Sequence, residues 1–411
     1  MKIRRVPFPK FGDGVGLYRV QSIAATMGLD LASFSANAAA ITGSNGKGST
    51  AAMLASVLGE AGGPVGLFTS PHFFRLNERF QIDGDAIGDA ELEYHWRRAE
   101  AAVKQWSAAN EEIVGGFEFL FLIAADWFAT RRCTSTVWEA GIGGRYDPVR
   151  LICARRTALV SLDLEHTALL GETLELIAYD KLDAAPHGAK VFLGDDCAPL
   201  RTRLESYCNL REVQPLFLSG ADLGEFTPPL AGAYQRNNAA LAVALARDMA
   251  ASLDDAKIAR GLAATRWPGR LEIIETAPLV VIDAGHTPAG VRAALEAFQS
   301  LRGDRLALLV CAASHDKNAA TLIGALAPAF DRIICASARH KGAPAGEIAA
   351  AAASANPRAE ISIAESVSEA RTLALSQARA NGAIYVAGGL FLAAEFKAAH
   401  LGLDPATLVF F

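Results

Sequence analysis

The sequence predicts an α/β protein with two parallel-sheet domains, and three observations support this fold class. Short β-branched runs alternate with alanine-rich helical runs along the chain of 411 residues, as expected where crossover helices join parallel strands. A glycine-rich loop near residue 43 separates an apolar run from a helix-forming run. Pro268 and Gly269 then interrupt the alternation, because both residue types break regular structure, and they predict a domain boundary.

The glycine-rich loop predicts a phosphate-binding site. Residues 38–41 are apolar enough for a buried strand, and residues 49–58 have helical periodicity, so backbone N–H groups at the helix start would point at an anion. Glycines let the backbone approach phosphate oxygens, Lys47 supplies a positive charge near the β- and γ-phosphates, and a nearby hydroxyl can reach Mg²⁺. The residues predicted to bind the phosphates here are Gly43, Ser44, Asn45, Gly46, Lys47, Gly48 and Ser49.

The loop departs from the strict Walker spacing. Ile41 stands where the first glycine would fall, and Gly48 separates Lys47 from Ser49. The alternative interpretation is an ordinary glycine-rich turn.

The remaining elements follow from the same alternation along the chain. Strands are expected at residues 135–139, 157–162, 279–283, 306–312, 332–337 and 383–387. Helices are expected at residues 289–301, 319–330 and 368–381, and the alanine-rich stretch 343–355 has helical composition. The four strands expected after residue 278 can form an α/β unit of their own.

Composition narrows the class of protein further. A hydrophobic content of 51% with 20% charged residues is typical of a folded chain with a large buried core, and about 150 residues per domain gives two or three domains. A net charge of −5 provides no electrostatic footprint for nucleic acid, and no apolar run is long enough to span a membrane. We therefore expect neither nucleic acid nor a membrane as a partner.

The start of the chain and the cysteines indicate a cytoplasmic protein. The charged residues that follow Met1 do not lead into the apolar run of a signal peptide. The six cysteines are scattered without the spacing of a metal site, so we expect free, buried thiols in a reducing cytoplasm.

Two further segments carry polar residues that periodicity does not require. Ser70 and His72 follow the end of an expected strand, and Glu139 ends another strand just before three glycines. Ligands of parallel α/β sheets bind at the carboxyl ends of the strands, where an acid, a hydroxyl and a histidine would suit Mg²⁺. Alternatively, Glu139 is a capping or ion-paired residue.

Read together, these segments resemble the folylpolyglutamate synthase and dihydrofolate synthase family, within the Mur ligase superfamily. The resemblance covers nearly the whole chain. Its motifs, in order, are Gly-Leu-Tyr-Arg-Val at 16–20, the Asn-Gly-Lys-Gly-Ser loop, Ser-Pro-His at 70–72, Asn-Glu-Arg at 77–79, Phe-Glu-Phe at 117–119, Glu-x-Gly-x-Gly-Gly-Arg from 139, Tyr-Gln-Arg-Asn-Asn-Ala at 234–239 and Trp-Pro-Gly-Arg at 267–270. The resemblance implies a P-loop-containing parallel-sheet ATPase domain at residues 1–268 and a smaller Rossmann-like α/β domain, which binds the amino acid, at residues 269–411.

The activity that this resemblance implies is that of an ATP-dependent carboxylate-amine ligase. ATP phosphorylates a carboxylate, an amino acid attacks the acyl phosphate, and an amide forms with loss of phosphate. The implied partners are a small-molecule carboxylate of folate or pteroate type and L-glutamate, with ATP and Mg²⁺ as cofactors, and we expect a monomer. Two alternatives are a divergent paralogue that joins a different amino acid to a non-folate carboxylate, and a nucleotide-binding protein without ligase turnover.

The resemblance also assigns roles to individual residues. The positions that match metal-binding residues of the family are Ser70, Glu139, His166 and Lys181, of which Lys181 matches a lysine that is carbamylated in many relatives. Asn238 and Arg270 match residues that contact the nucleotide, Asp283 matches the ribose-binding acid, and His286 matches a histidine near the phosphates and the incoming amine. The catalytic residues implied are Lys47, Lys181 and His286. Alternatively, Lys181 is a surface lysine on a helix and His166 a core histidine.

Several positions depart from the family pattern. Residues 283–288 read Asp-Ala-Gly-His-Thr-Pro where the family usually has Asp-Gly-Ala-His-Asn-Pro, and residues 388–391 read Gly-Gly-Leu-Phe where it has Gly-Ser-Leu-Tyr. The Leu-Asp-His and Glu-Lys-Ala-Gly runs are also changed, to Leu-Glu-His at 164–166 and Asp-Lys-Leu-Asp at 180–183. Losing a hydrogen-bonding group at a substrate can shift specificity strongly. We therefore expect the first-domain chemistry to be better kept than amino-acid recognition.

Overall fold

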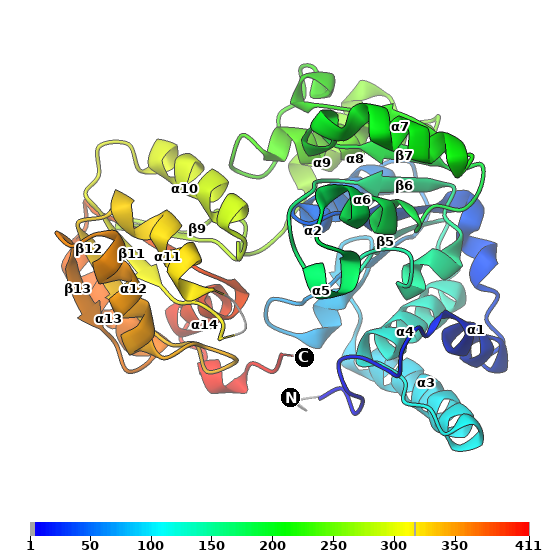
Figure 1. Cartoon of the computed structure of the whole chain (residues 1–411), viewed down its shortest axis with the longest axis horizontal. Coiled ribbons are helices and arrows are strands. Elements are labelled where there is room, and N and C mark those ends of the chain that lie inside the picture. The colour runs from blue at the N-terminus through cyan, green and yellow to red at the C-terminus, as the bar shows by residue number, and fades with distance from the viewer. Residues whose placement is uncertain (1–4, 316–317, 411) are drawn as a thin grey trace.

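Two α/β units, each built on its own sheet, make up the computed structural model, which describes residues 5–315 and 318–410 (Figure 1). Within these residues the first sheet has eight strands in the order β4-β3-β2-β5-β1-β6-β7-β8. Its strands are β1 (Ala38–Thr42), β2 (Val65–Phe68), β3 (Phe80–Ile82), β4 (Asp85–Ala86), β5 (Ser135–Glu139), β6 (Arg156–Leu159), β7 (Lys190–Leu193) and β8 (Gln214–Phe217). All neighbours are parallel except β2 with β3 and β3 with β4.

The second sheet has six strands in the described part of the chain, in the order β13-β12-β11-β14-β10-β9, and only β9 runs antiparallel to its neighbour. Its strands are β9 (Glu272–Thr276), β10 (Leu279–Ile282), β11 (Ala307–Cys311), β12 (Arg332–Cys335), β13 (Glu360–Ile363) and β14 (Ala383–Ala387). Two mainly parallel sheets, formed one after the other along the chain, confirm the predicted α/β fold class.

The helices lie on both faces of each sheet. Those of the first unit are α1 (Leu17–Thr26), α2 (Lys47–Gly59), α3 (Asp89–Asn110), α4 (Gly116–Thr130), α5 (Thr167–Leu170), α6 (Leu174–Leu182), α7 (Arg201–Leu210), α8 (Gln235–Met249) and α9 (Asp255–Ala264). Those of the second unit are α10 (Pro288–Arg302), α11 (Ala319–Leu326), α12 (Ala345–Ala355), α13 (Val367–Ala378) and α14 (Leu390–His400). None of the helices in the described residues combines the length and apolarity needed to cross a membrane.

Alternating strand residues explain the two-sided packing, because successive side chains of a strand point to opposite faces. In β1, Ala38 and Ala40 pack with α1, α3 and α4, whereas Ala39 and Ile41 pack with α2, α8 and α9. In the second sheet, β10 likewise divides its residues between α10, α11 and α12 on one face and α13 and α14 on the other. Both sheets are therefore buried, and their strand ends are left to form sites.

Several elements differ from those expected from the sequence. The strand expected at 157–162 ends at Leu159, because the chain then turns so that the Ser161 carbonyl accepts the Ser44 N–H at 3.0 Å. The helix expected at 319–330 ends at Leu326, close to the helix-breaking Pro328. β9 and β13 were not expected, and both are half-exposed strands at the two edges of the second sheet.

The cysteines were expected to be buried throughout, and this is wrong for two of them. Cys133 and Cys153 are half-buried, whereas the other four free thiols are buried. The parallel register of β11 and β12 places Cys311 opposite Cys335, with their Sγ atoms 4.0 Å apart.

Candidate functional site

The glycine-rich loop joins β1 to α2, as the sequence predicts, and it packs tightly against later parts of the chain. Gly46 caps α2 with φ of 79°, a conformation that side chains disfavour. A Cβ atom at Gly46 would lie 2.5 Å from Asn238 Oδ1, and one at Gly48 would lie 2.6 Å from the Trp267 ring. Glycine is thus required by close approach as well as by backbone conformation.

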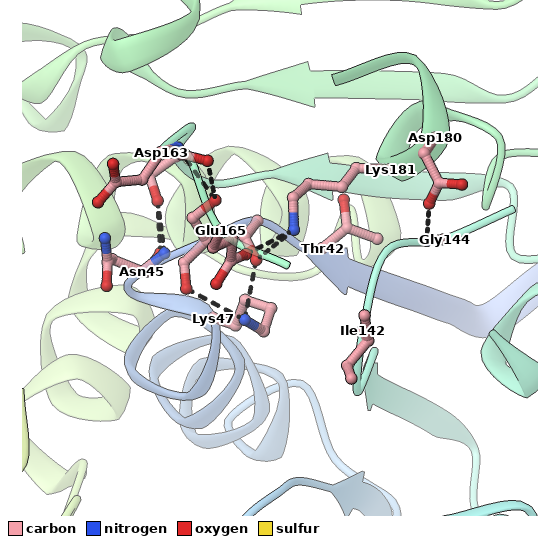
Figure 2. Close-up of polar contacts among 12 residues, drawn as sticks. Thr42, Asn45, Lys47, Ile142, Gly144, Asp163, Glu165, Asp180 and Lys181 are labelled. Carbon is pink, nitrogen blue, oxygen red and sulfur yellow. Dashed lines mark hydrogen bonds and ion pairs between the residues drawn. The ribbon is translucent and has the colours of Figure 1, made fainter. Parts of the chain in front are cut away.

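Two lysines converge on the loop carbonyl of Gly43 (Figure 2). Lys47 Nζ donates to the Gly43 carbonyl at 2.8 Å and to the Ser44 carbonyl at 3.2 Å. Lys181 Nζ, from α6, donates to the same Gly43 carbonyl at 3.1 Å. Lys181 is only 1% exposed, so the alternative interpretation as a surface lysine is wrong.

Glu165 is the carboxylate that sequence analysis missed. Its Oε1 accepts a hydrogen bond from Lys181 Nζ at 2.9 Å. Burial alone would raise the pKa of the Glu165 carboxyl, yet attraction to Lys47 and Lys181 brings that pKa down to about 2. Burial and then repulsion from Lys47 lower the pKa of Lys181, against the pull of Glu165. The one sequence feature that points to Glu165 is the change from Leu-Asp-His to Leu-Glu-His at 164–166, and in that run only His166 is predicted to bind a metal.

Glu139 and Ser70, both predicted metal ligands, lie together. Glu139 ends β5 with 4% of its surface exposed, and its Oε2 accepts the Ser70 N–H at 2.9 Å. Burial raises the pKa of Glu139, although Lys47, the Ser70 N–H and two arginines, Arg79 and Arg270, act in the opposite direction. A carboxylate and a hydroxyl-bearing residue are thus brought beside the phosphate loop.

Among the four predicted metal ligands, Ser70 and Glu139 contact each other through a hydrogen bond. Ser70 pairs with Glu139, whereas Lys181 pairs with Glu165, the residue before His166. His166 itself precedes α5 and has φ of 47°. Among the described residues, no three His, Cys, Asp or Glu side chains gather into a metal-binding group. Lys47 acts electrostatically on both Glu139 and Glu165, and so couples the Ser70–Glu139 contact to the Lys181–Glu165 contact.

The second domain reaches this site at the start of α10. Thr287 Oγ1 donates to Asn45 Oδ1 of the phosphate loop at 3.2 Å, and it also accepts the Gly290 N–H at 3.1 Å as the cap of α10. His286, the residue before, is exposed. The N-terminus of α10 is therefore placed at the loop, although sequence analysis had assigned Thr287 no contact.

The predicted nucleotide contacts lie around the same junction. Asn238, on α8, packs on Gly46 and donates to Gln235 Oε1 at 2.8 Å. Asp283 directly follows β10 and is 2% exposed; burial raises its pKa, against the positive charge of Arg270. Arg270 therefore acts on both Asp283 and Glu139, one from each domain.

A further acid, Asp147, holds the loop that follows Glu139. Asp147 Oδ2 accepts the N–H groups of Gly141 and Ile142 at 2.8 and 3.2 Å, and its Oδ1 accepts the Val149 N–H at 3.0 Å. Burial outweighs these donors and raises the pKa of Asp147 to about 7. Farther along the loop, Asp180 Oδ1 accepts the Gly144 N–H at 2.9 Å, which fixes the residue before Lys181 (Figure 2).

The residues present fit a nucleotide with a divalent cation. The loop backbone at the start of α2 is shaped for an anion, and Lys47 adds a positive charge beside it. Glu139, Glu165 and the Ser70 hydroxyl are oxygen donors, the kind that Mg²⁺ prefers.

A phosphate loop on a parallel sheet, met by the start of a helix from a second α/β domain, places the chain in the Mur ligase fold class. Consistently, residues 269–390 match the family described as Mur ligase, glutamate ligase domain. The chain is 32% identical to the folylpolyglutamate synthase of Lacticaseibacillus casei, over 71% of this chain and 74% of the relative. The chain belongs to the folylpolyglutamate synthase family.

Two other similar proteins extend this comparison. A probable bifunctional folylpolyglutamate synthase/dihydropteroate synthase of Halobacterium salinarum is 34% identical over 87% of this chain. The chain spans about half of that relative's length, 46%. The bifunctional folylpolyglutamate synthase/dihydrofolate synthase of Yersinia pestis, solved with AMPPNP and a manganese ion, has 25% identity and a TM-score of 0.81, covering 95% of this chain and 94% of that one.

Proposed function

We propose that this chain is an ATP-dependent ligase that joins the amino group of L-glutamate to a carboxylate of a folate or pteroate-type substrate. One observation carries the proposal: the two domains meet at the phosphate loop, where Thr287 donates a hydrogen bond to Asn45, close in sequence to Lys47. The folylpolyglutamate synthases of the family and the AMPPNP of the Yersinia pestis structure support it.

The chemistry has two steps. A carboxylate oxygen attacks the γ-phosphorus of ATP, the bond to the bridging oxygen breaks, and ADP leaves. The amine nitrogen then attacks the acyl carbon, the bond to the phosphate oxygen breaks, and the amine loses a proton as phosphate leaves. Most of the rate enhancement would come from positioning and from neutralising phosphate charge.

We assign the phosphates to Gly43–Ser49, with Lys47 neutralising the charge that develops on the transferred group. Asn238, Arg270 and Asp283 would bind the rest of the nucleotide. His286, exposed at the start of α10, lies in the second domain, where the amine is expected to enter. Closure of the two domains over these groups would exclude water, which matters because an acyl phosphate hydrolyses readily.

The proposed metal ligands are Ser70, Glu139, His166 and Lys181. A bound Mg²⁺ would supply positive charge to the phosphate oxygens. Lys181 would serve as an oxygen ligand once its neutral amine adds to CO₂, which forms an N–C bond and releases one proton. The carbamate would replace one of two ammonium groups that share the Gly43 carbonyl, and its charge would favour a divalent cation.

Phosphate release that depends on both a carboxylate and an amino acid tests the proposal. We expect turnover with L-glutamate and dihydropteroate or a reduced folate, and none when either is omitted. Efficient ligation of another amino acid, with no glutamate product, would instead favour the divergent paralogue. Nucleotide binding without phosphate release, whichever carboxylate and amino acid are combined, would identify a nucleotide-binding protein without ligase activity.

We also propose that the protein acts as a monomer in the cytoplasm. The free thiols of all six cysteines support a reducing compartment. Light scattering coupled to size-exclusion chromatography, at several protein concentrations, would test the oligomeric state.

A further inference from the structure

Residues 408–410 leave the second domain and lie against the first, where the end of the chain drawn in red meets the light-blue loop in Figure 1. The Val409 carbonyl lies 2.7 Å from His72 Nε2. The Phe410 ring stacks on the His72 ring, with centroids 5.6 Å apart and planes 7° apart. On the side of the second domain, Phe410 packs against Phe391 at 4.8 Å and His340 at 5.4 Å. The 408–410 segment thus bridges the two domains.

His72 continues the connection into the proposed active site. It is 2% exposed, and Arg79 Nε lies 3.0 Å from His72 Nδ1. Because an arginine Nε only donates, His72 Nδ1 accepts, and the Nε2–H donates to the Val409 carbonyl. Arg79 is 3% exposed and acts electrostatically on Glu139. Hydrogen bonds therefore link Val409 to Arg79 through His72, and the charge of Arg79 acts on the Glu139 carboxylate, which accepts the Ser70 N–H.

The residues after His72 are fixed in the same place. Phe73 is 5% exposed and packs in one apolar cluster with Val280 and Ile282 of β10. The Glu78 carboxylate accepts the N–H groups of Phe73, Phe74 and Arg75 at 2.7, 3.0 and 2.8 Å. The 70–74 loop is thus held within its own domain by Glu78, and against the other domain by the packing of Phe73 on β10 and by the 408–410 segment.

We propose that His72 is a positioning residue for the ligase reaction, and that the 408–410 segment fixes it so that the Ser70–Glu139 pair is correctly placed only when the second domain is docked. The role of the pair as metal ligands rests on the function proposed above. The bridge itself stands on the contacts of His72 and Phe410. Docking of the second domain would then couple amino-acid binding to metal binding.

Phe410→Ala tests the bridge, with Phe410→Tyr as the conservative variant and Leu403→Ala, at a 52% exposed position, as the control. Hydrogen exchange of the amides of residues 70–79 reports the loop, and Mn²⁺ affinity in the presence of AMPPNP reports the metal position. One aromatic contact and one hydrogen bond correspond to roughly tenfold in an equilibrium. We expect about tenfold faster exchange and about tenfold weaker Mn²⁺ binding in Phe410→Ala, and neither change in the other two variants.

His72→Gln provides a second test, because glutamine keeps one donor and one acceptor, whereas His72→Ala leaves Arg79 Nε without its acceptor. We expect His72→Gln to restore most of the Mn²⁺ affinity that His72→Ala loses. Unchanged exchange at 70–79 in Phe410→Ala would overturn the bridge, and faster exchange with unchanged Mn²⁺ affinity would overturn its coupling to the metal. If the wild-type chain binds no AMPPNP with Mn²⁺, the proposed function fails, while the exchange result still decides whether the 408–410 segment holds the loop.

Discussion

Thr287 of the second domain donates a hydrogen bond to Asn45 of the phosphate loop, with Oγ1 and Oδ1 3.2 Å apart. The same hydroxyl accepts the Gly290 N–H and so caps α10. One side chain therefore sets both the start of a helix in the second domain and its distance from the loop that we assign to ATP. Thr287 is 8% exposed, so water does not readily replace either bond.

Thr287→Val should weaken the contact between the two domains and, with it, nucleotide binding. The substitution keeps the shape of the side chain but removes the cap and the contact with Asn45, and the loss of a cap alone costs about 1 kcal/mol. We expect a lower melting temperature and weaker AMPPNP binding, measured by calorimetry. Thr276→Val, which changes an exposed threonine of the edge strand β9, is the control. Unchanged AMPPNP affinity in Thr287→Val would contradict a role for the contact in nucleotide binding.

Amino-acid choice is best tested at the same position. Thr287 stands where the family usually has asparagine, and Gly389 stands where it has serine. Gly389 has φ of 144°, which a side chain rarely adopts, so Gly389→Ser would be strained even though open space surrounds the position. Thr287→Asn alone is therefore the cleaner variant. If these positions reshaped the amino-acid site, Thr287→Asn should raise glutamate use relative to other amino acids in a competition assay. An unchanged preference would indicate that Thr287 does not set specificity.

Lys47→Ala should abolish phosphate release while the fold survives. The Lys47 ammonium donates to the carbonyls of Gly43 and Ser44 in the loop, and removing one preorganised charge from a transferring group costs about 10²-fold or more in rate. Lys104→Ala, on an exposed lysine of α3, is the matched control. Circular dichroism checks the fold, and the ligation assay checks activity. Turnover at the wild-type rate in Lys47→Ala would remove Lys47 from the catalytic assignment.

The proposed carbamate gives a prediction with a spectroscopic readout. Protein equilibrated with ¹³C-bicarbonate should show one carbamate carbon signal that is absent from Lys181→Ala. The variant should lose activity, and a small added carboxylic acid should restore part of it by supplying an oxygen ligand. A wild-type spectrum without the signal, in the presence of AMPPNP and Mg²⁺, would show that Lys181 keeps a free amine paired with Glu165.

Local sequence patterns predict much of the fold, because strands such as β5 and β14 are short apolar runs bounded by turns. The phosphate loop was also predictable, since glycine and lysine at a strand-to-helix junction have a local cause. β13 was not predictable, because an edge strand with half-exposed residues need not be a continuous apolar run. Edge strands need only one hydrogen-bonded neighbour and little burial.

The site was less predictable than the fold, for a different reason. Glu139 ends β5 and Ser70 lies just after the neighbouring parallel strand β2, so their proximity follows from topology. Glu165 and Thr287 make their contacts with Lys181 and Asn45, which lie 16 and 242 positions away along the chain. Such pairs depend on how a loop turns and how two domains dock, and a single sequence carries no local signal for either. The metal, nucleotide and catalytic roles of these residues stay predictions.

Asp147 gives the chain a distinctive dependence of stability on pH. Burial raises its pKa from 3.8 to about 7, so between these values the folded protein keeps a proton that the unfolded chain has lost. Because the folded state binds more protons in this window, the free energy of unfolding falls as the pH rises from about 4 to 7, by up to about 1.4 kcal/mol per pH unit. Asp147→Asn resembles the protonated acid and does not titrate. The free energy of unfolding of the variant minus that of wild type should therefore be larger at pH 8 than at pH 5. We expect this difference to grow by about 2 to 3 kcal/mol, measured by urea unfolding. Parallel pH profiles for the two proteins, or a ¹³C carboxyl shift of Asp147 that titrates near pH 4, would show that its three backbone donors outweigh its burial.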